Sequence, residues 1–221
     1  MKITHISIAA ALLVAAGYAS AQKAGTVSIE LGVTKLAPQV TSGDLSAPAF
    51  PSTKADVTSA TGLTGAANYM VTDSIALNVP LGLGFKHDIT GASRAAGFGK
   101  IAEVRALPIT VLGQYRFGDA SATFRPYLGA GLTYAKFYKE TGSAGLTALT
   151  NPGGTPTTLS VGSKIAPSFQ VGAVFNINDK WFVNANYVKT LLKVNVSFSN
   201  GQTQELKLNP NAFSAAVGYK F

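Results

Sequence analysis

The residues best suited to catalysis are the adjacent pair His87 and Asp88, together with Ser93 a short distance further along the chain. A carboxylate that orients an imidazole, which then activates a hydroxyl, is the arrangement of a hydrolase nucleophile. The sequence around these residues has no nucleophile-elbow motif, and Ser and Thr are abundant along the whole chain, so His87 is better interpreted as a residue of an outer loop. His87 is also the one His beyond the N-terminal segment, and Cys is absent, so there is no metal-ligand set. We therefore expect no enzyme, no metal and no other cofactor.

The composition favours a membrane protein. Of the 221 residues, 47% are hydrophobic and only 13% are charged, whereas soluble domains carry about 25% charged residues. Beyond the N-terminus, however, no apolar run reaches the length of about 18 residues that a transmembrane helix needs. In lipid every backbone polar group must pair within the protein, and only helices and closed sheets achieve this. The sequence therefore predicts a transmembrane β-barrel.

The net charge of +8 comes from 18 Lys and Arg against 10 Asp and Glu. These cations are scattered, without a basic run or a basic helix, so nucleic acid is not an expected partner. Attraction to anionic lipopolysaccharide would make use of the charge, and a merely solvated rim is the equally good alternative.

The N-terminus has the pattern of a secretory signal peptide. Lys2 precedes an apolar stretch over residues 6–16, and the small-residue triplet Ala19-Ser20-Ala21 follows. We expect residues 1–21 to be cleaved as a signal peptide and residues 22–221 to form a single barrel domain in the bacterial outer membrane.

Beyond this leader, the chain consists of segments in which apolar and polar residues alternate, as the two faces of a strand require. In the first segment, for example, Val27, Ile29, Leu31 and Val33 share one face. Segments of about ten residues match the strands of outer-membrane barrels. The eight segments are 25–36, 58–71, 74–85, 100–117, 124–138, 164–177, 180–198 and a last one that ends at Phe221.

The connections between these segments alternate in length. Residues 72–73, 118–123 and 178–179 are short, as periplasmic turns are, whereas residues 37–55, 86–99 and 139–163 are long, as extracellular loops are. A tight hairpin is expected near residues 200–201. The predicted fold is all-β, an eight-stranded antiparallel transmembrane barrel, with the strand register uncertain above Lys189 and below Pro210.

The apolar face of the segments is expected to meet lipid, because it is nearly free of charge and its aromatic residues gather near strand ends. Phe221 ends the last alternating strand and resembles the C-terminal signal by which barrels are recognised for insertion, so we expect the barrel-assembly machinery as a partner. The aromatic residues of this face are Phe85, Tyr115, Phe117, Phe124, Tyr134, Phe175, Trp181, Tyr187, Tyr219 and Phe221.

The opposite, inward face is rich in glycine and alanine. Small inward residues either leave space for a solute path or let bulky neighbours interdigitate in a curved sheet. Bulkier inward residues could form an apolar constriction or simply fill the core. These constriction candidates are Met70, Leu112, Tyr127, Val174 and Phe182.

Four charged residues lie on the inward face, near the periplasmic end: Glu30, Arg116, Arg125 and Lys220. A buried charge needs a partner, so we expect Glu30 to bond one or more of the cations. The result would be either a periplasmic gate or, as the better interpretation, a structural ion network.

Prolines fall within four of the strands: Pro80, Pro108, Pro167 and Pro210. Each removes a ladder donor, which confines proline to edges and bulges. One such position, at the height of the outer leaflet, could part the wall and release apolar molecules sideways. The alternative is a set of bulges that only adjust curvature.

Several stretches resemble the outer-membrane protein W (OmpW) family, which includes alkane-uptake barrels. They are Phe85–Ile89, KIAEVRALPITVLGQYRF at 100–117, FRPYLGAGLTYAKFY at 124–138, NDKWFVNANY at 178–187 and VGYKF at 217–221. The chain departs from the family pattern at Ile109 and Asn211. The resemblance implies an eight-stranded barrel with a narrow, hydrophobic lumen that passes small apolar solutes.

We therefore expect a passive channel for small hydrophobic molecules, with release through the barrel wall. The alternative is a non-conducting, plugged barrel with a structural, adhesion or receptor role. Outer-membrane lipid, lipopolysaccharide and small apolar solutes are the expected partners.

Overall fold

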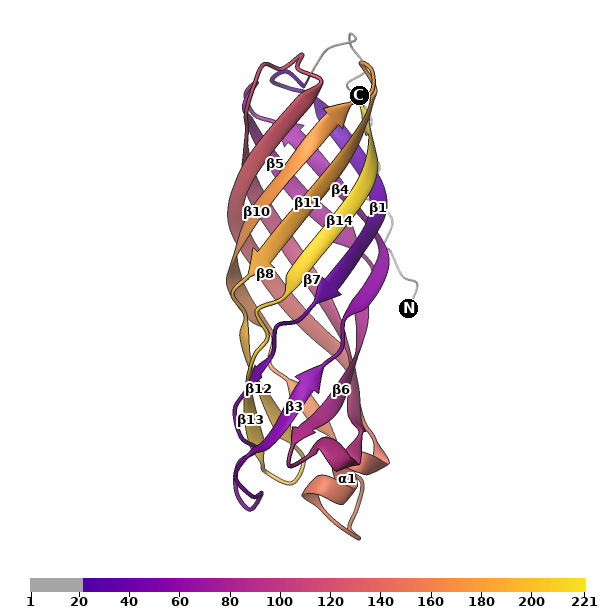
Figure 1. Cartoon of the computed structure of the whole chain (residues 1–221), viewed down its shortest axis with the longest axis vertical. Helices are drawn as coiled ribbons and strands as arrows, with labels where there is room; N and C mark the ends of the chain where they lie inside the picture. The colour runs from indigo at the N-terminus through magenta and orange to yellow at the C-terminus, as the bar shows by residue number, and fades with distance from the viewer. Residues whose placement is uncertain (1–21) are drawn as a thin grey trace, which may run out of the picture.

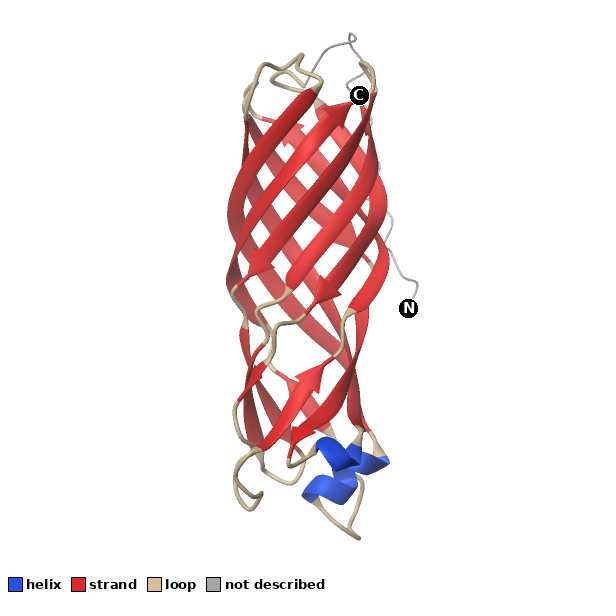
Figure 2. Ribbon diagram, in the orientation of Figure 1, coloured by secondary structure: helices blue, strands red, loops and turns tan. Residues whose placement is uncertain are grey.

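The computed structural model describes residues 22–221, so the predicted signal peptide lies outside the described residues. Strands account for nearly all of the regular structure and wind into one long cylinder (Figure 1). The short helical segments gather at one end of the cylinder, opposite the C-terminus (Figure 2). In residues 22–221 there is no helix with the length and apolar character to cross a membrane.

Eight antiparallel strands close into a barrel, as the alternating segments predicted. The order around the barrel is β7-β5-β4-β1-β14-β11-β10-β8, and pairing of β8 with β7 closes the ring. The eight strands are β1 (Val27–Ala37), β4 (Ala60–Met70), β5 (Ile75–Gly82), β7 (Lys100–Arg116), β8 (Phe124–Gly142), β10 (Lys164–Asn176), β11 (Trp181–Thr190) and β14 (Asn211–Lys220). We call the end with the short turns the periplasmic or lower end, and the opposite end the outer or upper end, so that Figure 1 draws the molecule with its lower end at the top.

The apolar face of these strands points outward. On β1, Leu31 is 70% exposed, whereas its neighbour Glu30 is only 8% exposed. The other strands repeat this alternation. An apolar belt around a closed sheet, with polar side chains inside, suits hydrocarbon and not water. The predicted orientation of the two faces is therefore confirmed.

Aromatic side chains mark the height of the membrane. Toward the periplasmic end, Trp181 and Tyr219 pack edge to face with ring centroids 5.0 Å apart, and Phe221 continues the row at 5.1 Å from Tyr219. At the opposite boundary, the rings of Tyr187 and Phe213 lie 5.1 Å apart. Rings at these two levels form the girdles that flank the apolar band of outer-membrane barrels.

Beyond the outer boundary the barrel continues as an extension that the sequence pattern did not predict. Strand β6 (Phe85–Ser93) pairs with the upper part of β7 and with β3 (Thr53–Val57). A second sheet contains β2 (Thr41–Ser42), β13 (Thr203–Lys207), β12 (Lys193–Phe198) and β9 (Leu159–Val161). The helical segments η1 (Ala96–Phe98) and α1 (Ala144–Thr150) complete the extension.

The extension corrects three sequence-based boundaries. The predicted loop 86–99 is mostly strand β6, and the predicted strand 74–85 ends at Gly82. The predicted strand 180–198 is two strands, β11 and β12, separated at residues 191–192. The expected hairpin is confirmed, because the Phe198 backbone N–H donates to the Gln202 carbonyl at 2.9 Å.

Burial explains why these connections form strands. Side chains from β3, β6, β7, β9, β12, β13 and α1 pack into one apolar cluster inside the extension. Above the membrane the outside is water, so the apolar residues turn inward, as in a soluble protein. The buried members include Ile89, Val104, Leu146, Val161, Val194, Val196 and Leu206.

Candidate solute cavity and wall opening

A cavity of about 150 Å³ runs inside the barrel from the extension into the outer half of the membrane-spanning part. A space of this size accommodates a molecule such as benzene. Its upper wall is apolar and includes Ile89, Val104, Val194 and Leu208. The cavity therefore begins as an apolar compartment above the lipid.

Hydroxyl groups surround the middle of the cavity. The Thr34 hydroxyl lies 2.7 Å from those of Thr64 and Ser214. On the opposite wall a second chain joins Thr110, Thr133, Ser168 and Thr190 with spacings of 2.7–2.8 Å. Because a hydroxyl both donates and accepts, these groups satisfy one another. The belt is therefore only weakly polar toward a solute.

Below this belt, a network of amides and charges closes the lumen. The Glu30 carboxylate accepts from the side-chain amides of Asn68 and Asn184, each at 2.8 Å. The Gln114 amide donates to Gln170 at 2.8 Å, and Arg116 donates to Gln114 at 2.8 Å. All of these side chains are buried. Each of these side chains has at least one hydrogen-bond partner, so the layer resists entry of both ions and apolar solutes.

The four predicted inward charges all lie in or near this closed end, but the expected direct bond from Glu30 to a cation is wrong. Within residues 22–221, no Lys or Arg forms an ion pair with Glu30. Asn68 lies between the two charges, since it donates to Glu30 and accepts from Arg116 at 3.3 Å. An amide offers both a donor and an acceptor, so it links an anion to a cation without direct contact.

Arg125 and Lys220 close the periplasmic end with backbone contacts. The Arg125 guanidinium donates to carbonyl groups of the turns, including that of Asp73 at 2.6 Å. Lys220 Nζ lies 3.2 Å from both the Asn176 side chain and the Asn178 carbonyl. Gln22 accepts from Arg116 at 2.7 Å and is 1% exposed, so the first described residue also fills this end.

The five constriction candidates are buried inside the barrel, but none of them lines the cavity. Tyr127, Val174 and Phe182 form one apolar cluster, and the Tyr127 hydroxyl donates to Asn184 at 2.9 Å. Met70 and Leu112 are 2% and 0% exposed. They are therefore part of the filled lower lumen, and their role in restricting passage stays a prediction.

Glycines on the inner face are mostly filled by neighbours. A Cβ added at Gly218 would collide with the Phe182 ring, and one at Gly172 would meet the Tyr127 ring at 2.5 Å. These glycines of the lower barrel therefore make room for bulky neighbouring side chains and do not leave an open path for a solute.

The wall of the barrel parts between β5 and β7. The two strands pair only from Ile75–Tyr115 to Asn78–Leu112. Pairing with β7 resumes at Phe85–Ala106, on β6. Residues 79–84 and 107–111 therefore face each other without ladder hydrogen bonds. The cavity reaches this parting, because Leu81, Leu83 and Leu107 line it.

Two of the four prolines border the parting. Pro80 lies on its β5 side and Pro108 on its β7 side, and both line the cavity. Pro167, on β10, pairs normally with Leu132 and does not line the cavity. Pro210 precedes β14, where its carbonyl accepts from the Thr190 N–H at 3.1 Å. The structure thus brings together two of the predicted lateral-opening residues and separates the other two.

The prediction that Phe85 belongs to the outward, lipid-facing side of the strands is wrong. It is 5% exposed and lines the cavity, whereas Leu83, two residues earlier, is 82% exposed. The irregular backbone at residues 83–84 reverses the direction of the side chains between β5 and β6.

The residues considered for catalysis do not converge. His87 points into the barrel and is 2% exposed, and its ring Nδ1 lies 2.6 Å from the Thr58 carbonyl oxygen. Asp88 instead pairs with Lys100 at 2.6 Å on the outer wall. Ser93 ends β6, in register with Thr53. In the described part of the chain there is also no group of three or more His, Cys, Asp or Glu side chains that could hold a metal.

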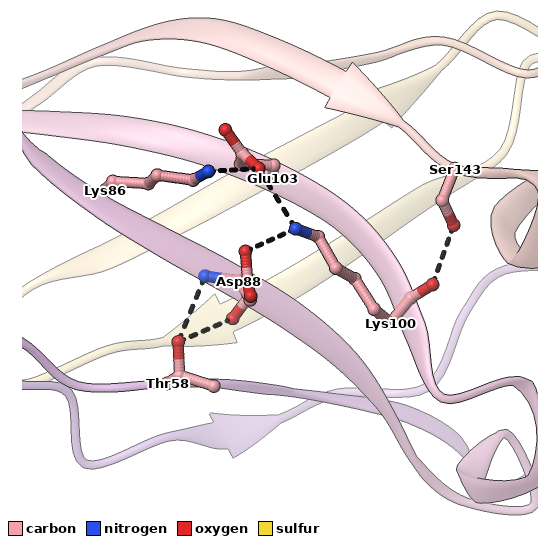
Figure 3. Close-up of polar contacts among 6 residues, drawn as sticks. All are labelled: Thr58, Lys86, Asp88, Lys100, Glu103 and Ser143. Atoms are coloured by element: carbon pink, nitrogen blue, oxygen red, sulfur yellow. Dashed lines mark hydrogen bonds and ion pairs between the residues drawn. The ribbon is translucent and has the colours of Figure 1, made fainter.

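A small ion network covers the outer wall of the extension (Figure 3). Glu103 pairs with Lys86 at 2.9 Å and with Lys100 at 3.0 Å. Hydrogen bonds from these two lysines lower the pKa of Glu103, and the bonds to Asp88 and Glu103 raise the pKa of Lys100. Since the network is exposed to water and joins charged side chains of both strands, it contributes modestly to the joint between β6 and β7.

Comparison with known proteins identifies the family. Residues 23–221 match the model of the OmpW family. Outer membrane protein W of Vibrio cholerae serotype O1 is 35% identical over 157 residues, which cover 69% of this chain and 70% of that protein. The chain belongs to the OmpW family. The resemblance found in the sequence is thereby confirmed.

Two further proteins are similar to this chain. The crystal structure of the outer membrane protein OprG from Pseudomonas aeruginosa matches with a TM-score of 0.81 at 23% identity, covering 93% of this chain and 99% of that chain. The dibenzothiophene metabolism operon protein PahQ of Pseudomonas aeruginosa is 26% identical over 175 residues, 77% of this chain and 76% of that protein. As a member of the OmpW family, the protein is an outer-membrane barrel.

Sequence reasoning missed the inward amides of this OmpW barrel as functional residues. Asn68, Asn78, Gln114, Gln170 and Asn184 form the floor of the cavity, and Glu30 alone could not have closed it. The sequence does contain a sign of them, because an Asn or Gln recurs on the polar, inward-facing side of five strands. Only their neighbours in space, set by the barrel register, show that they meet in one layer.

Proposed function

We propose that this OmpW-family protein is a passive channel that takes small hydrophobic molecules from outside the cell and releases them sideways into the outer membrane. The apolar interior of the extension collects the solute, and the weakly polar hydroxyl belt admits it to the spanning part. The filled lower lumen stops it there. The solute then leaves through the parting between β5 and β7.

One observation carries this proposal: Leu81 and Leu83 line the cavity while being 56% and 82% exposed on the outer face of the barrel. A side chain with both properties stands at a gap in the wall. The parting lies within the membrane-spanning part, so the gap faces acyl chains. An apolar solute loses nothing by moving from such a cavity into hydrocarbon.

The relation to PahQ supports an apolar solute, since its name places that protein in a dibenzothiophene metabolism operon. The closed polar floor supports lateral over axial exit, because an apolar molecule would have to displace satisfied hydrogen bonds to reach the periplasm. Few unpaired charges line the cavity, which argues against selective transport of ions.

The test is entry of an apolar fluorescent probe into liposomes that contain the purified barrel. We expect Leu81→Trp, which places a bulky ring at the gap, to slow entry severalfold. Leu128→Trp is the matched control, because Leu128 is 54% exposed to lipid and lies away from the cavity. A heat-modifiable gel shift would report that both variants fold.

Two further variants test the prolines and the edge of the gap. Pro80→Val should reduce entry, whereas Pro167→Val, outside the parting, should leave it unchanged. A Cβ at Gly84 would collide with the Tyr138 hydroxyl, so Tyr138 borders the gap and Tyr138→Ala should quicken entry. Equal rates for Leu81→Trp, Leu128→Trp and wild type would contradict lateral release. No entry with wild type would contradict the channel itself.

The closed floor also favours a second function, a non-conducting barrel with a structural, adhesion or receptor role. The contacts among Glu30, Asn68 and Arg116 support it, because they tie charged and amide side chains together across the lower lumen. This function predicts that wild-type liposomes admit the probe no faster than empty ones.

Two further partners belong to this proposal. Outward cations near the outer boundary, such as Lys35 and Lys136, are placed to meet lipopolysaccharide phosphates. Phe221 ends the chain beside Tyr219 and is 41% exposed, which suits contact with the barrel-assembly machinery.

A further inference from the structure

His87 is the one titratable side chain in the upper part of the solute cavity. It lies on β6, opposite Val104 of β7, and is 2% exposed. The side chains that surround it in the cavity lining, including Phe85, Ile89 and Val104, are apolar. An imidazole in such surroundings needs an explanation, because a buried polar group without a partner is costly.

One ring nitrogen of His87 is already committed. Nδ1 lies 2.6 Å from the Thr58 carbonyl oxygen. A carbonyl can only accept, so Nδ1 carries the proton and donates. Thr58 is held in place by two bonds to Asp88. Its backbone N–H donates to the Asp88 carbonyl at 2.9 Å. Its hydroxyl accepts from the Asp88 N–H at 3.0 Å, a contact drawn in Figure 3. The tautomer and the direction of the ring are therefore fixed.

The other nitrogen, Nε2, has no hydrogen-bond partner in the described residues, although His87 lines the cavity. In a neutral ring with a proton on Nδ1, Nε2 carries a lone pair and can only accept. Burial lowers the pKa of His87, while the bond to Thr58 and the charge of Asp88 raise it. The net direction is downward, which favours the neutral ring at neutral pH.

A second unpaired acceptor lies at the lower end of the same cavity. Asn68 must donate to the Glu30 carboxylate, so its oxygen faces Asn78 and accepts the Asn78 amide at 2.7 Å. This leaves Asn78 Oδ1 buried without a partner. His87 Nε2 and Asn78 Oδ1, one at each end of the cavity, are thus both acceptors without a partner in the described residues.

We propose that the cavity binds small apolar molecules that carry a hydroxyl group, such as phenols and alcohols, with the O–H donating to Nε2 of His87. This inference rests on the proposed function and narrows its solute class. A site with a buried acceptor rejects the analogue that lacks the donor, because the acceptor is then left unpaired. A hydrocarbon of equal size fits the same space but leaves Nε2 unsatisfied.

Phenol and toluene form the matched pair of probes, since they differ by a hydroxyl in place of a methyl group. Wild-type barrel in lipid nanodiscs should bind phenol about three- to tenfold more tightly than toluene. His87→Leu, of similar volume, should lose this preference and still bind toluene. Phe85→Leu, a lining change that leaves the imidazole intact, should keep the preference.

A direct reading comes from the wild-type protein, in which His87 is the one histidine of residues 22–221. With ¹⁵N-labelled histidine, phenol should shift the Nε2 resonance and toluene should not. An unshifted Nε2 at saturating phenol, or an equal preference for phenol in wild type and His87→Leu, would overturn the inference. If toluene still bound in that case, the proposed channel function would not be contradicted. If neither probe binds or enters, the proposed function fails, and the inference fails with it.

Discussion

The Asn68 side chain donates to the Glu30 carboxylate at 2.8 Å, and this contact sets the orientation of the amides around it. Because a carboxylate only accepts, the Asn68 nitrogen must face Glu30 and its oxygen must face the other way. That oxygen then accepts from Asn78 and Arg116. One carboxylate therefore organises the layer that closes the lumen.

Replacing Glu30 by Ala should destabilise the barrel, because the amides of Asn68 and Asn184 would lose their acceptor in a buried layer. The expected loss is about 2 kcal/mol, typical of buried polar groups left unpaired. Urea unfolding in lipid bilayers measures it. Asp44→Ala, an exposed acid without a partner in the described contacts, is the control. Equal stability of the two variants would show that the Glu30 network contributes nothing.

The filled lower lumen predicts a contrast between two glycines. Gly218→Ala should cost about 1–3 kcal/mol, because its Cβ collides with the Phe182 ring and forces the packed side chains to move. Gly113→Ala should be nearly neutral, since its Cβ would lie 3.8 Å from the nearest atom, the Ala130 carbonyl oxygen. The same unfolding measurement compares them. A neutral Gly218→Ala would mean that the lumen at this height has free space.

The burial of His87 predicts a pH dependence of stability. Its pKa in the folded barrel lies below the ordinary value of 6.5, chiefly because burial disfavours the charged ring. The unfolded chain therefore binds more protons as the pH falls below 6.5, and the stability present above that pH is progressively lost. Unfolding at about pH 7.5 and about pH 5 should show a lower urea midpoint at the acidic pH. In His87→Gln this difference should shrink, and an unchanged pH difference would assign the effect to other groups.

Phe221 predicts an effect on assembly and not on the finished fold. Phe221→Ala should lower the amount of protein in the outer membrane, if the terminal aromatic residue is what the assembly machinery contacts. The comparison is Phe175→Ala, an equally lipid-facing aromatic residue (48% exposed, against 41% for Phe221) elsewhere on the belt. Membrane fractionation followed by immunoblotting gives the amounts. Similar losses for both variants would point to general packing of the aromatic girdle instead of recognition of the terminus.

The sequence by itself determined the eight strands, their outward apolar face and the family, because these depend on local alternation. A strand places successive side chains on opposite faces, so Ile29, Leu31 and Val33 reveal their common face without any knowledge of neighbours. The family motifs are likewise contiguous stretches. No long-range information is needed for either inference.

The extension shows where local alternation misleads. In β11 the odd residues Trp181, Val183 and Ala185 carry apolar side chains outward, whereas in β12 the apolar residues Val194, Val196 and Phe198 take the even, inward positions. The apolar side chains change from the outer to the inner face of the barrel because the chain passes from the hydrocarbon of the membrane into water. In the sequence alone this change reads as an uncertain register above Lys189.

Only the tertiary structure decided what closes the lumen and where the wall opens. The parting between residues 79–84 and 107–111 exists because β5 and β6 pair with β7 at two separate places, and pairing is a property of two strands. The unpaired Nε2 of His87 likewise depends on Thr58, which lies 29 positions away in sequence. Contacts between distant segments carry no periodic signal, so no reading of one strand at a time could have found them.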